Sequence, residues 1–272
     1  MDSQRLGESV SGMAGSARIR RILILGGTSE ARRLAEALSF RDDIAVTVSL
    51  AGRTESVPPL PVPVRIGGFG GAEGLADYLR KERIDILIDT THPYAAAISA
   101  NAAAAVQAAG VKLLSLRREP WSKMSGDKWI DVESMEEAVE ALGRDPKRVF
   151  LAIGRNNLAP FAAAPQHSYL VRSVDPVDPP LAVPQATYIT ARGPFSETHD
   201  RALLTDHRID VVVAKNSGGA AARGKIDAAR ALKIPVIMLK RPALPDVPAV
   251  ETVDEVLAWL DHAGTFDMAR GV

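Results

Sequence analysis

Two short polar stretches, each placed directly after an apolar run, contain residue types suited to binding anions. The first follows the run 22–25 and consists of Gly26, Gly27, Thr28 and Ser29. Thr28 or Ser29 can cap the helix that the apolar spacing of 31–38 predicts. A strand, a glycine turn and a helix start direct backbone N–H groups and the positive end of the helix dipole at one point, where a phosphate fits. A Gly-Gly pair is weaker than the full dinucleotide fingerprint, so the turn alone also fits an ordinary strand–helix connection.

The second polar stretch lies in the other half of the chain, after the apolar run 209–214. It consists of Lys215, Asn216, Ser217, Gly218 and Gly219. Because this stretch also leads into a helix, its backbone donors, hydroxyl group and ammonium group converge on an anion. Arginines follow other expected strands of the same half, at Arg155, Arg192 and Arg241. Together these groups indicate a ligand with several negative charges.

The end of the strand expected at 44–50 bears on the choice of nucleotide. Dinucleotide-binding folds usually place an acid there, which binds the adenosine ribose. In this sequence Ser49, Arg53 and Thr54 occupy that corner instead. A cationic corner favours a ribose that carries a 2′-phosphate, and therefore NADP rather than NAD. The alternative is that Arg53 is an ordinary solvated loop arginine.

Composition and missing motifs exclude several classes of function. The 272 residues are 46% hydrophobic with a formal net charge of zero, so no broad attraction to nucleic acid or to a membrane surface is implied. No cysteine is present, which excludes thiolate metal sites and fits a reducing, cytoplasmic compartment. The histidines lack metal-ligand spacing, and the P-loop-like segment 219–225 is followed by Ile226, where Ser or Thr must hold magnesium. We therefore expect no metal, no nucleic acid and no membrane partner.

These polar stretches need a scaffold in which strands alternate with helices. Apolar runs at 22–25, 44–50 and 84–89 predict buried strands, and the residues between them have helical spacing. The pattern then recurs, because 209–214 repeats 84–89 and is followed by a similar helix and strand. We predict an α/β fold with two similar Rossmann/flavodoxin-like halves, mostly parallel sheets and a cleft between the halves.

Taken together, the motifs of this chain resemble those of the precorrin-6A reductases, the NADPH-dependent family of cobalamin biosynthesis. The resemblance extends from about Ile22 to Leu260 and rests on the motifs Gly26–Arg32, Asp89–Ala95, Glu119–Trp121, Gly154–Asn156, Lys215–Gly219 and Ile234–Met238. Small departures are Thr90, where the family often has Ala, and Tyr94, where it often has Phe. The resemblance implies transfer of a hydride from NADPH to a ring double bond of precorrin-6A, while the neighbouring carbon takes a proton to give precorrin-6B.

The implied substrate is a cyclic tetrapyrrole with acetate and propionate groups, which accounts for the cationic loops and suits a wide cleft. We expect a disordered leader at 1–18, an NADP-binding α/β domain at 19–143, and a second α/β domain at 144–272 that contributes to the tetrapyrrole site. We also expect a monomer, with transient contacts to neighbouring pathway enzymes as a further option.

Each polar stretch can be given a role on this basis. The pyrophosphate is expected at Gly26, Gly27, Thr28 and Ser29, and the 2′-phosphate at Ser49 and Arg53. The nicotinamide is expected near Thr91, His92 and Tyr94, because they follow the strand next to the glycine turn. The tetrapyrrole carboxylates are expected at Arg155, Lys215, Ser217, Gly218 and Gly219.

The proton donor and the substrate leave alternatives open. His92 and Lys215 have suitable side chains for donating the proton, but a water molecule could do so, and His92 is equally well explained as a capping residue bonded to the backbone. The rival substrate is the cobalt-bearing precorrin of the anaerobic route. A rival of another class is a non-catalytic NADP-binding sensor or tetrapyrrole carrier.

Overall fold

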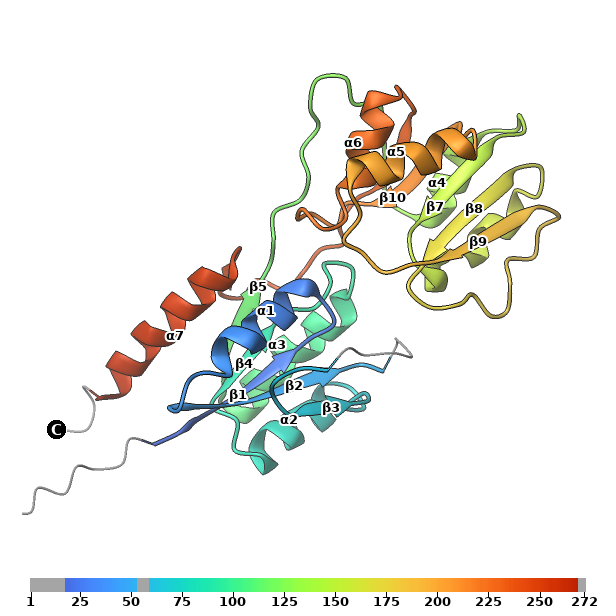
Figure 1. The fold of residues 1–272 in the computed structure, drawn as a ribbon. Coiled ribbons are helices and arrows are strands. Elements are labelled where there is room, and N and C mark those ends of the chain that lie inside the picture. Colours follow the sequence, from blue (N-terminus) through green and yellow to red (C-terminus); the bar gives the residue numbers. More distant parts are fainter. Residues whose placement is uncertain (1–17, 53–58, 269–272) are drawn as a thin grey trace, which may run out of the picture.

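A computed structural model describes residues 18–52 and 59–268 and places them in two α/β lobes (Figure 1). Residues 1–17 of the expected leader, together with Arg53 and Thr54, lie outside the described residues. Each lobe contains one sheet of six parallel strands, so the predicted fold class and the similarity of the two halves are confirmed. Within the described part of the chain, no helix combines the length and the apolar character needed to cross a membrane.

The sheet of the first lobe has the order β12-β5-β4-β1-β2-β3, which is the Rossmann arrangement. Its strands are β1 (Arg20–Leu25), β2 (Ile44–Leu50), β3 (Val64–Ile66), β4 (Ile86–Asp89), β5 (Lys112–Leu116) and β12 (Ala249–Val250). The central strands consist of continuous apolar runs because helices cover both faces of the sheet. Ile22, Leu23 and Ile24 accordingly have no exposed surface.

Two helices pack on each face of this first sheet. α1 (Ser29–Leu38) and α7 (Val253–Met268) cover one face, and α2 (Ala72–Lys81) and α3 (Ala96–Ala109) cover the other (Figure 1). The apolar residues of α1 recur at helical spacing, and Leu34 and Leu38 are buried against the strands. The glycine turn is therefore fixed between a buried strand and a packed helix.

The second lobe repeats this arrangement with the strand order β6-β11-β10-β7-β8-β9. Its strands are β6 (Trp129–Val132), β7 (Arg148–Ala152), β8 (Ser168–Ser173), β9 (Ala186–Thr190), β10 (Val211–Lys215) and β11 (Val236–Leu239). α4 (Met135–Leu142) packs on one face, and α5 (Glu197–Asp206) with α6 (Gly224–Ala231) packs on the other. The expected helix at 158–164 is a 3₁₀ helix at Ala159–Ala163, preceded by another at Arg155–Asn157.

The two lobes exchange their last strands. β6 follows β5 in the chain but pairs with β11 in the second sheet, whereas β12 follows β11 and pairs with β5 in the first sheet. The helices that follow these strands, α4 and α7, pack on the same sheets as the strands do. The chain therefore crosses between the lobes twice. The predicted boundary at 143/144 does not match the sheets, because the first lobe comprises 18–116 and 249–268 and the second comprises 129–239.

Candidate functional site

The first polar stretch forms a tight turn between β1 and α1. A Cβ at position 26 would lie 2.9 Å from Val48 Cγ1, so the close approach of β1 and β2 requires glycine there. Thr28 is the N-cap of α1: its Oγ1 accepts a hydrogen bond from the N–H of Ala31 at 3.1 Å and donates to Thr90 O at 2.8 Å. Because the first N–H groups of a helix lack intrahelical partners, this turn can bind a phosphate.

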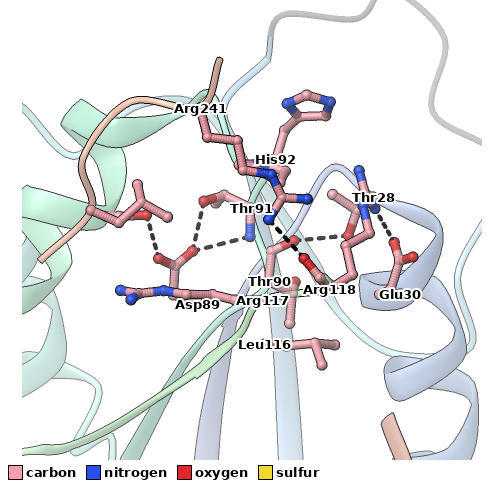
Figure 2. A pocket seen from close by; sticks show the side chains of 13 residues that line it. Thr28, Glu30, Asp89, Thr90, Thr91, His92, Leu116, Arg117, Arg118 and Arg241 are labelled. Carbon is pink, nitrogen blue, oxygen red and sulfur yellow. Dashed lines mark hydrogen bonds and ion pairs between the residues drawn. The ribbon is translucent and has the colours of Figure 1, made fainter. Parts of the chain in front are cut away.

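The loop after β4 lies beside the glycine turn, as predicted, and a buried carboxylate fixes its shape. Asp89 accepts hydrogen bonds from the N–H of Thr91 at 3.0 Å, from Thr91 Oγ1 at 2.7 Å and from Ser99 Oγ at 2.6 Å (Figure 2). Thr90 Oγ1 donates to Leu25 O at 2.7 Å. The backbone of 89–91 is thereby held against the end of β1, with Thr91 at the edge of two cavities.

His92 is a neutral imidazole at ordinary pH. Burial, followed by the positive charges of Arg118 and Lys215, lowers the pKa of His92 to about 3. Its Nδ1 accepts a hydrogen bond from the N–H of Tyr94 at 3.3 Å. The geometry agrees with the capping alternative for His92, and a neutral ring is a poor source of a proton.

Tyr94 brings this loop into contact with the second lobe. Its hydroxyl accepts a hydrogen bond from the N–H of Asn216 at 2.7 Å and donates to Leu239 O at the end of β11. The Lys215 ammonium lies 5.3 Å from the centre of the Tyr94 ring. Burial lowers the pKa of Lys215 to about 8. The structure therefore gathers His92, Tyr94 and Lys215, which the sequence places far apart.

Next to the glycine turn, a cavity of about 260 Å³ opens at the carboxyl ends of β1 to β4. Its lining includes Gly26, Ser49, the loop 67–71 and Thr91. Arg65 on β3 lies opposite Ser49 in the strand register, and its Nη1 donates to Ser49 Oγ at 3.3 Å.

Arg65 also shapes the wall of this cavity. Its Nη2 donates to Gly68 O at 2.7 Å, and the guanidinium carbon lies 3.8 Å from the centre of the Phe69 ring. Sequence reasoning missed this arginine. The parallel register of β2 and β3, which places residue 65 beside residue 49, is the signal that could have found it.

The residues expected to bind the tetrapyrrole carboxylates are only partly gathered. Lys215, Ser217, Gly218 and Gly219 form one loop after β10. Arg155 lies at the end of the neighbouring strand β7, where its Nη1 donates to Pro176 O at 3.2 Å and its Nη2 lies 3.8 Å from Asp175 Oδ2. Arg155 is therefore directed toward the loop after β8.

Two arginines from the connections between the lobes hold the loop after β10. Arg118 Nε donates to Ser217 O at 2.7 Å, and Arg241 donates to Ser217 O at 3.1 Å and to Asn216 O at 2.9 Å. Asn216 in turn exchanges two hydrogen bonds with the backbone of Trp121. In the sequence, these two arginines belong to basic pairs at 117–118 and 240–241, which follow the equivalent strands β5 and β11.

A small cavity lies between the first lobe and the two connections to the second lobe. It measures about 20 Å³ and is lined by Thr28, Glu30, His92, Arg118 and Arg241, among others (Figure 2). At this point the Tyr94 and Arg118 contacts join the two lobes directly, so the lobes leave little space there.

The chain is similar to known proteins over most of its length. The model of the family described as precorrin-6x reductase CbiJ/CobK matches residues 21–261. A precorrin-6A reductase of Sinorhizobium sp is 55% identical over 89% of this chain and 93% of its own length. The solved structure described as CobK precorrin-6A reductase has a TM-score of 0.86 and 48% identity, and the match covers 89% of this chain and 96% of that one. A cobalt-precorrin-6A reductase of Salmonella typhimurium is 30% identical over 87% of this chain and 91% of its own. The chain therefore belongs to the precorrin-6x reductase family.

Proposed function

We propose that this chain reduces precorrin-6A to precorrin-6B with a hydride from NADPH. The observation that carries the proposal is the meeting of the phosphate-binding turn of the first lobe with the cationic loop of the second, at Thr28, His92 and Lys215, in a member of the precorrin-6x reductase family. A chain with 55% identity to a precorrin-6A reductase favours this substrate over its cobalt-bearing counterpart, for which the identity is 30%.

The residues of the first lobe fit an NADP molecule. The turn at Gly26, Gly27, Thr28 and Ser29 would hold the pyrophosphate, since it leads into the start of α1. The cavity of about 260 Å³ would take the adenosine, with the 2′-phosphate at Ser49 beside the Arg65 guanidinium. Arg53, which the sequence assigns to the same phosphate, lies outside the described residues.

Thr91, His92 and Tyr94 would lie beside the nicotinamide. The cofactor supplies the hydride when bound, so the protein's part is to align donor and acceptor and to exclude water. Asp89 serves this alignment by fixing Thr91 through two hydrogen bonds. His92 contributes a neutral ring that neither repels nor neutralises an oxidised nicotinamide.

Lys215 is the proposed proton donor. Its pKa of about 8, lowered by burial, leaves most of the side chain protonated at neutral pH and close to the value at which proton transfer is efficient. His92, with a pKa of about 3, is almost entirely deprotonated at that pH. Of the two candidates that the sequence offered, Lys215 therefore has the suitable protonation state.

A macrocycle needs more room than the cavity of about 20 Å³ beside the two connections offers. The lobes are joined by two connections, so we propose that they separate around these connections when precorrin-6A binds. Gly218 and Gly219 would then offer backbone N–H groups, and Ser217 its hydroxyl, to the ring carboxylates.

The test of the function is to mix purified protein with NADPH and precorrin-6A. We expect oxidation of NADPH with stoichiometric formation of precorrin-6B, detected by absorbance and by a mass increase of the tetrapyrrole. Binding of both ligands without turnover would instead identify a sensor or carrier. Faster turnover of the cobalt-bearing precorrin would assign the protein to the anaerobic route.

A further inference from the structure

Arg118 contacts both of the ligand sites proposed above. Its Nη1 donates to Glu30 Oε2 at 2.7 Å (Figure 2), and its Nε donates to Ser217 O at 2.7 Å. Glu30 lies in the first turn of α1, directly after the phosphate-binding turn, and Ser217 lies in the loop after β10. One guanidinium group thus connects the turn for the cofactor with the loop for the tetrapyrrole.

This connection is shielded from solvent and closely packed. The side chains of Arg118 and Glu30 are 17% and 14% exposed, so salt screens their attraction less than it screens a surface ion pair. Gly219 lies against both residues, since a Cβ there would be 3.0 Å from Arg118 Cδ and 3.7 Å from Glu30 Oε1. The loop of the second lobe therefore rests directly on the start of α1.

An anion bound at the glycine turn would change the strength of the Arg118–Glu30 ion pair, because both charges lie close to that turn. Glu30 holds the Arg118 guanidinium at the start of α1, and Arg118 in turn offsets the repulsion between the Glu30 carboxylate and a diphosphate bound there. Among the described residues, Arg118 Nη2 has no acceptor, so it is able to donate to a phosphate. A diphosphate bound there would restrict the movement of the Arg118 guanidinium. Because Arg118 Nε donates to Ser217 O, the carbonyl of Ser217 would then be fixed as well.

We propose that Arg118 is a positioning residue that couples the two sites, so that a bound cofactor holds the loop 215–219 in the arrangement that accepts the tetrapyrrole carboxylates. This inference rests on the proposed function. By thermodynamic linkage, each ligand then tightens the binding of the other by the same factor. Glu30 holds Arg118 in place, Nη2 of Arg118 meets the diphosphate and its Nε fixes Ser217, and the residue takes no part in the transfer of hydride or proton.

Two neighbouring arginines separate this role from general support of the loop. Arg241 also donates to Ser217 O, at 3.1 Å, but within the described residues it makes no contact with Glu30. Arg33 lies 3.9 Å from Glu30 Oε1, but its side chain is 65% exposed and belongs to α1 itself. Arg33 therefore contributes charge near Glu30 without reaching the second lobe, which makes it a matched control.

The experiment measures the binding of uroporphyrin, a stable cyclic tetrapyrrole with carboxylate groups, by fluorescence in the presence and absence of saturating NADP⁺. In the wild-type protein we expect NADP⁺ to tighten uroporphyrin binding by about fivefold or more. In Arg118→Gln and in Glu30→Gln we expect this factor to fall to about one, because the charged link is lost. Arg33→Gln should keep the wild-type factor.

Thermal unfolding of each variant shows whether it is folded. If Arg118→Gln does not fold, Glu30→Gln and Arg118→Lys decide the matter, since lysine keeps the charge but cannot make both contacts and should give an intermediate factor. The proposal is overturned if NADP⁺ still tightens uroporphyrin binding by the wild-type factor in Glu30→Gln. It is also overturned if Arg118→Gln weakens the binding of both ligands but leaves that factor unchanged. NADP⁺ binding without any effect on uroporphyrin in the wild-type protein would also overturn it, whereas no NADP⁺ binding at all would refute the proposed function itself.

Discussion

The hydroxyl of Tyr94 in the first lobe accepts a hydrogen bond at 2.7 Å from the backbone N–H of Asn216 in the second. The same hydroxyl donates to Leu239 O, so one side chain joins the ends of two strands of the opposite lobe. Burial raises the pKa of Tyr94 to about 12, and the phenol therefore keeps its proton throughout the physiological range. This contact sets the position of the loop after β4 relative to Lys215.

Replacing Tyr94 by Phe should loosen the junction between the lobes. The substitution keeps the ring but leaves Asn216 N–H and Leu239 O without this partner, at a cost of about 1–3 kcal/mol. We expect a lower unfolding temperature and only a small change in the Kd for NADP⁺, because the glycine turn is untouched and the ring that would lie beside the nicotinamide is kept. Calorimetry and titration with NADP⁺ measure the two quantities. An unchanged unfolding temperature would show that the hydroxyl contributes nothing to the junction.

The reduction should slow at alkaline pH if Lys215 gives the proton. The donor is active in its protonated form, which is complete below its pKa of about 8 and is lost as the pH rises through that value. kcat at saturating NADPH should therefore fall about tenfold per pH unit above this point. Lys215→Gln should lower kcat by about 10²–10⁴-fold and abolish the alkaline limb. If the variant keeps the limb, a water molecule or another group is the donor.

Gly26→Ala should weaken both the fold and the binding of NADP⁺. The added Cβ would lie 2.9 Å from Val48 Cγ1 and 3.1 Å from Leu50 Cδ2, and relieving this overlap costs about 1–3 kcal/mol. Gly193→Ala, in the second lobe and away from the cofactor cavity, is the control, because a Cβ there meets nothing closer than 3.4 Å. Denaturant unfolding and NADP⁺ titration should separate the two variants. Equal behaviour of both would mean that the turn does not approach the cofactor.

Arg65→Gln should change the choice between the two nicotinamide cofactors. We expect the KM for NADPH to rise by about 10–100-fold, because a charged hydrogen bond to the 2′-phosphate is lost. The KM for NADH should change little, because NADH has no 2′-phosphate. Arg80→Gln, which removes an arginine from the surface of α2, is the control and should leave both values unchanged. Because Arg65 also binds Gly68 O, a merely structural role would raise both KM values together, and that result would contradict the charge-based role.

Local patterns were sufficient to predict the elements that form the site. The apolar runs of β1, β4 and β10 are short and buried on both faces, and glycine or polar residues end each of them, so strand and turn could be read directly. The N-cap at Thr28 follows from the same local chemistry, since it depends on residues three positions apart. These features need no information about the rest of the chain.

Long-range pairing could not be predicted in this way. Nothing in the residues of β6 indicates that this strand pairs with β11 rather than with β5, because both neighbours offer a similar apolar edge. The contact between Glu30 and Arg118 could not be predicted either, because the two residues are far apart in sequence and belong to no local pattern that distinguishes them. The lowered pKa of His92 likewise arises from burial at the junction and from the charges of Arg118 and Lys215, which only the folded chain brings close to it.

The exchange of β6 and β12 sets the order in which the lobes can be completed during synthesis. All strands of the second lobe lie between residues 129 and 239, so this lobe has its full sheet before residue 249 leaves the ribosome. The first lobe, although its strands are made earlier, must wait for β12 and for Val256 and Leu260 of α7, which have no exposed surface in the finished core. The lobe that contains the glycine turn is therefore the later of the two to be completed, although its first strand is made before any strand of the other lobe.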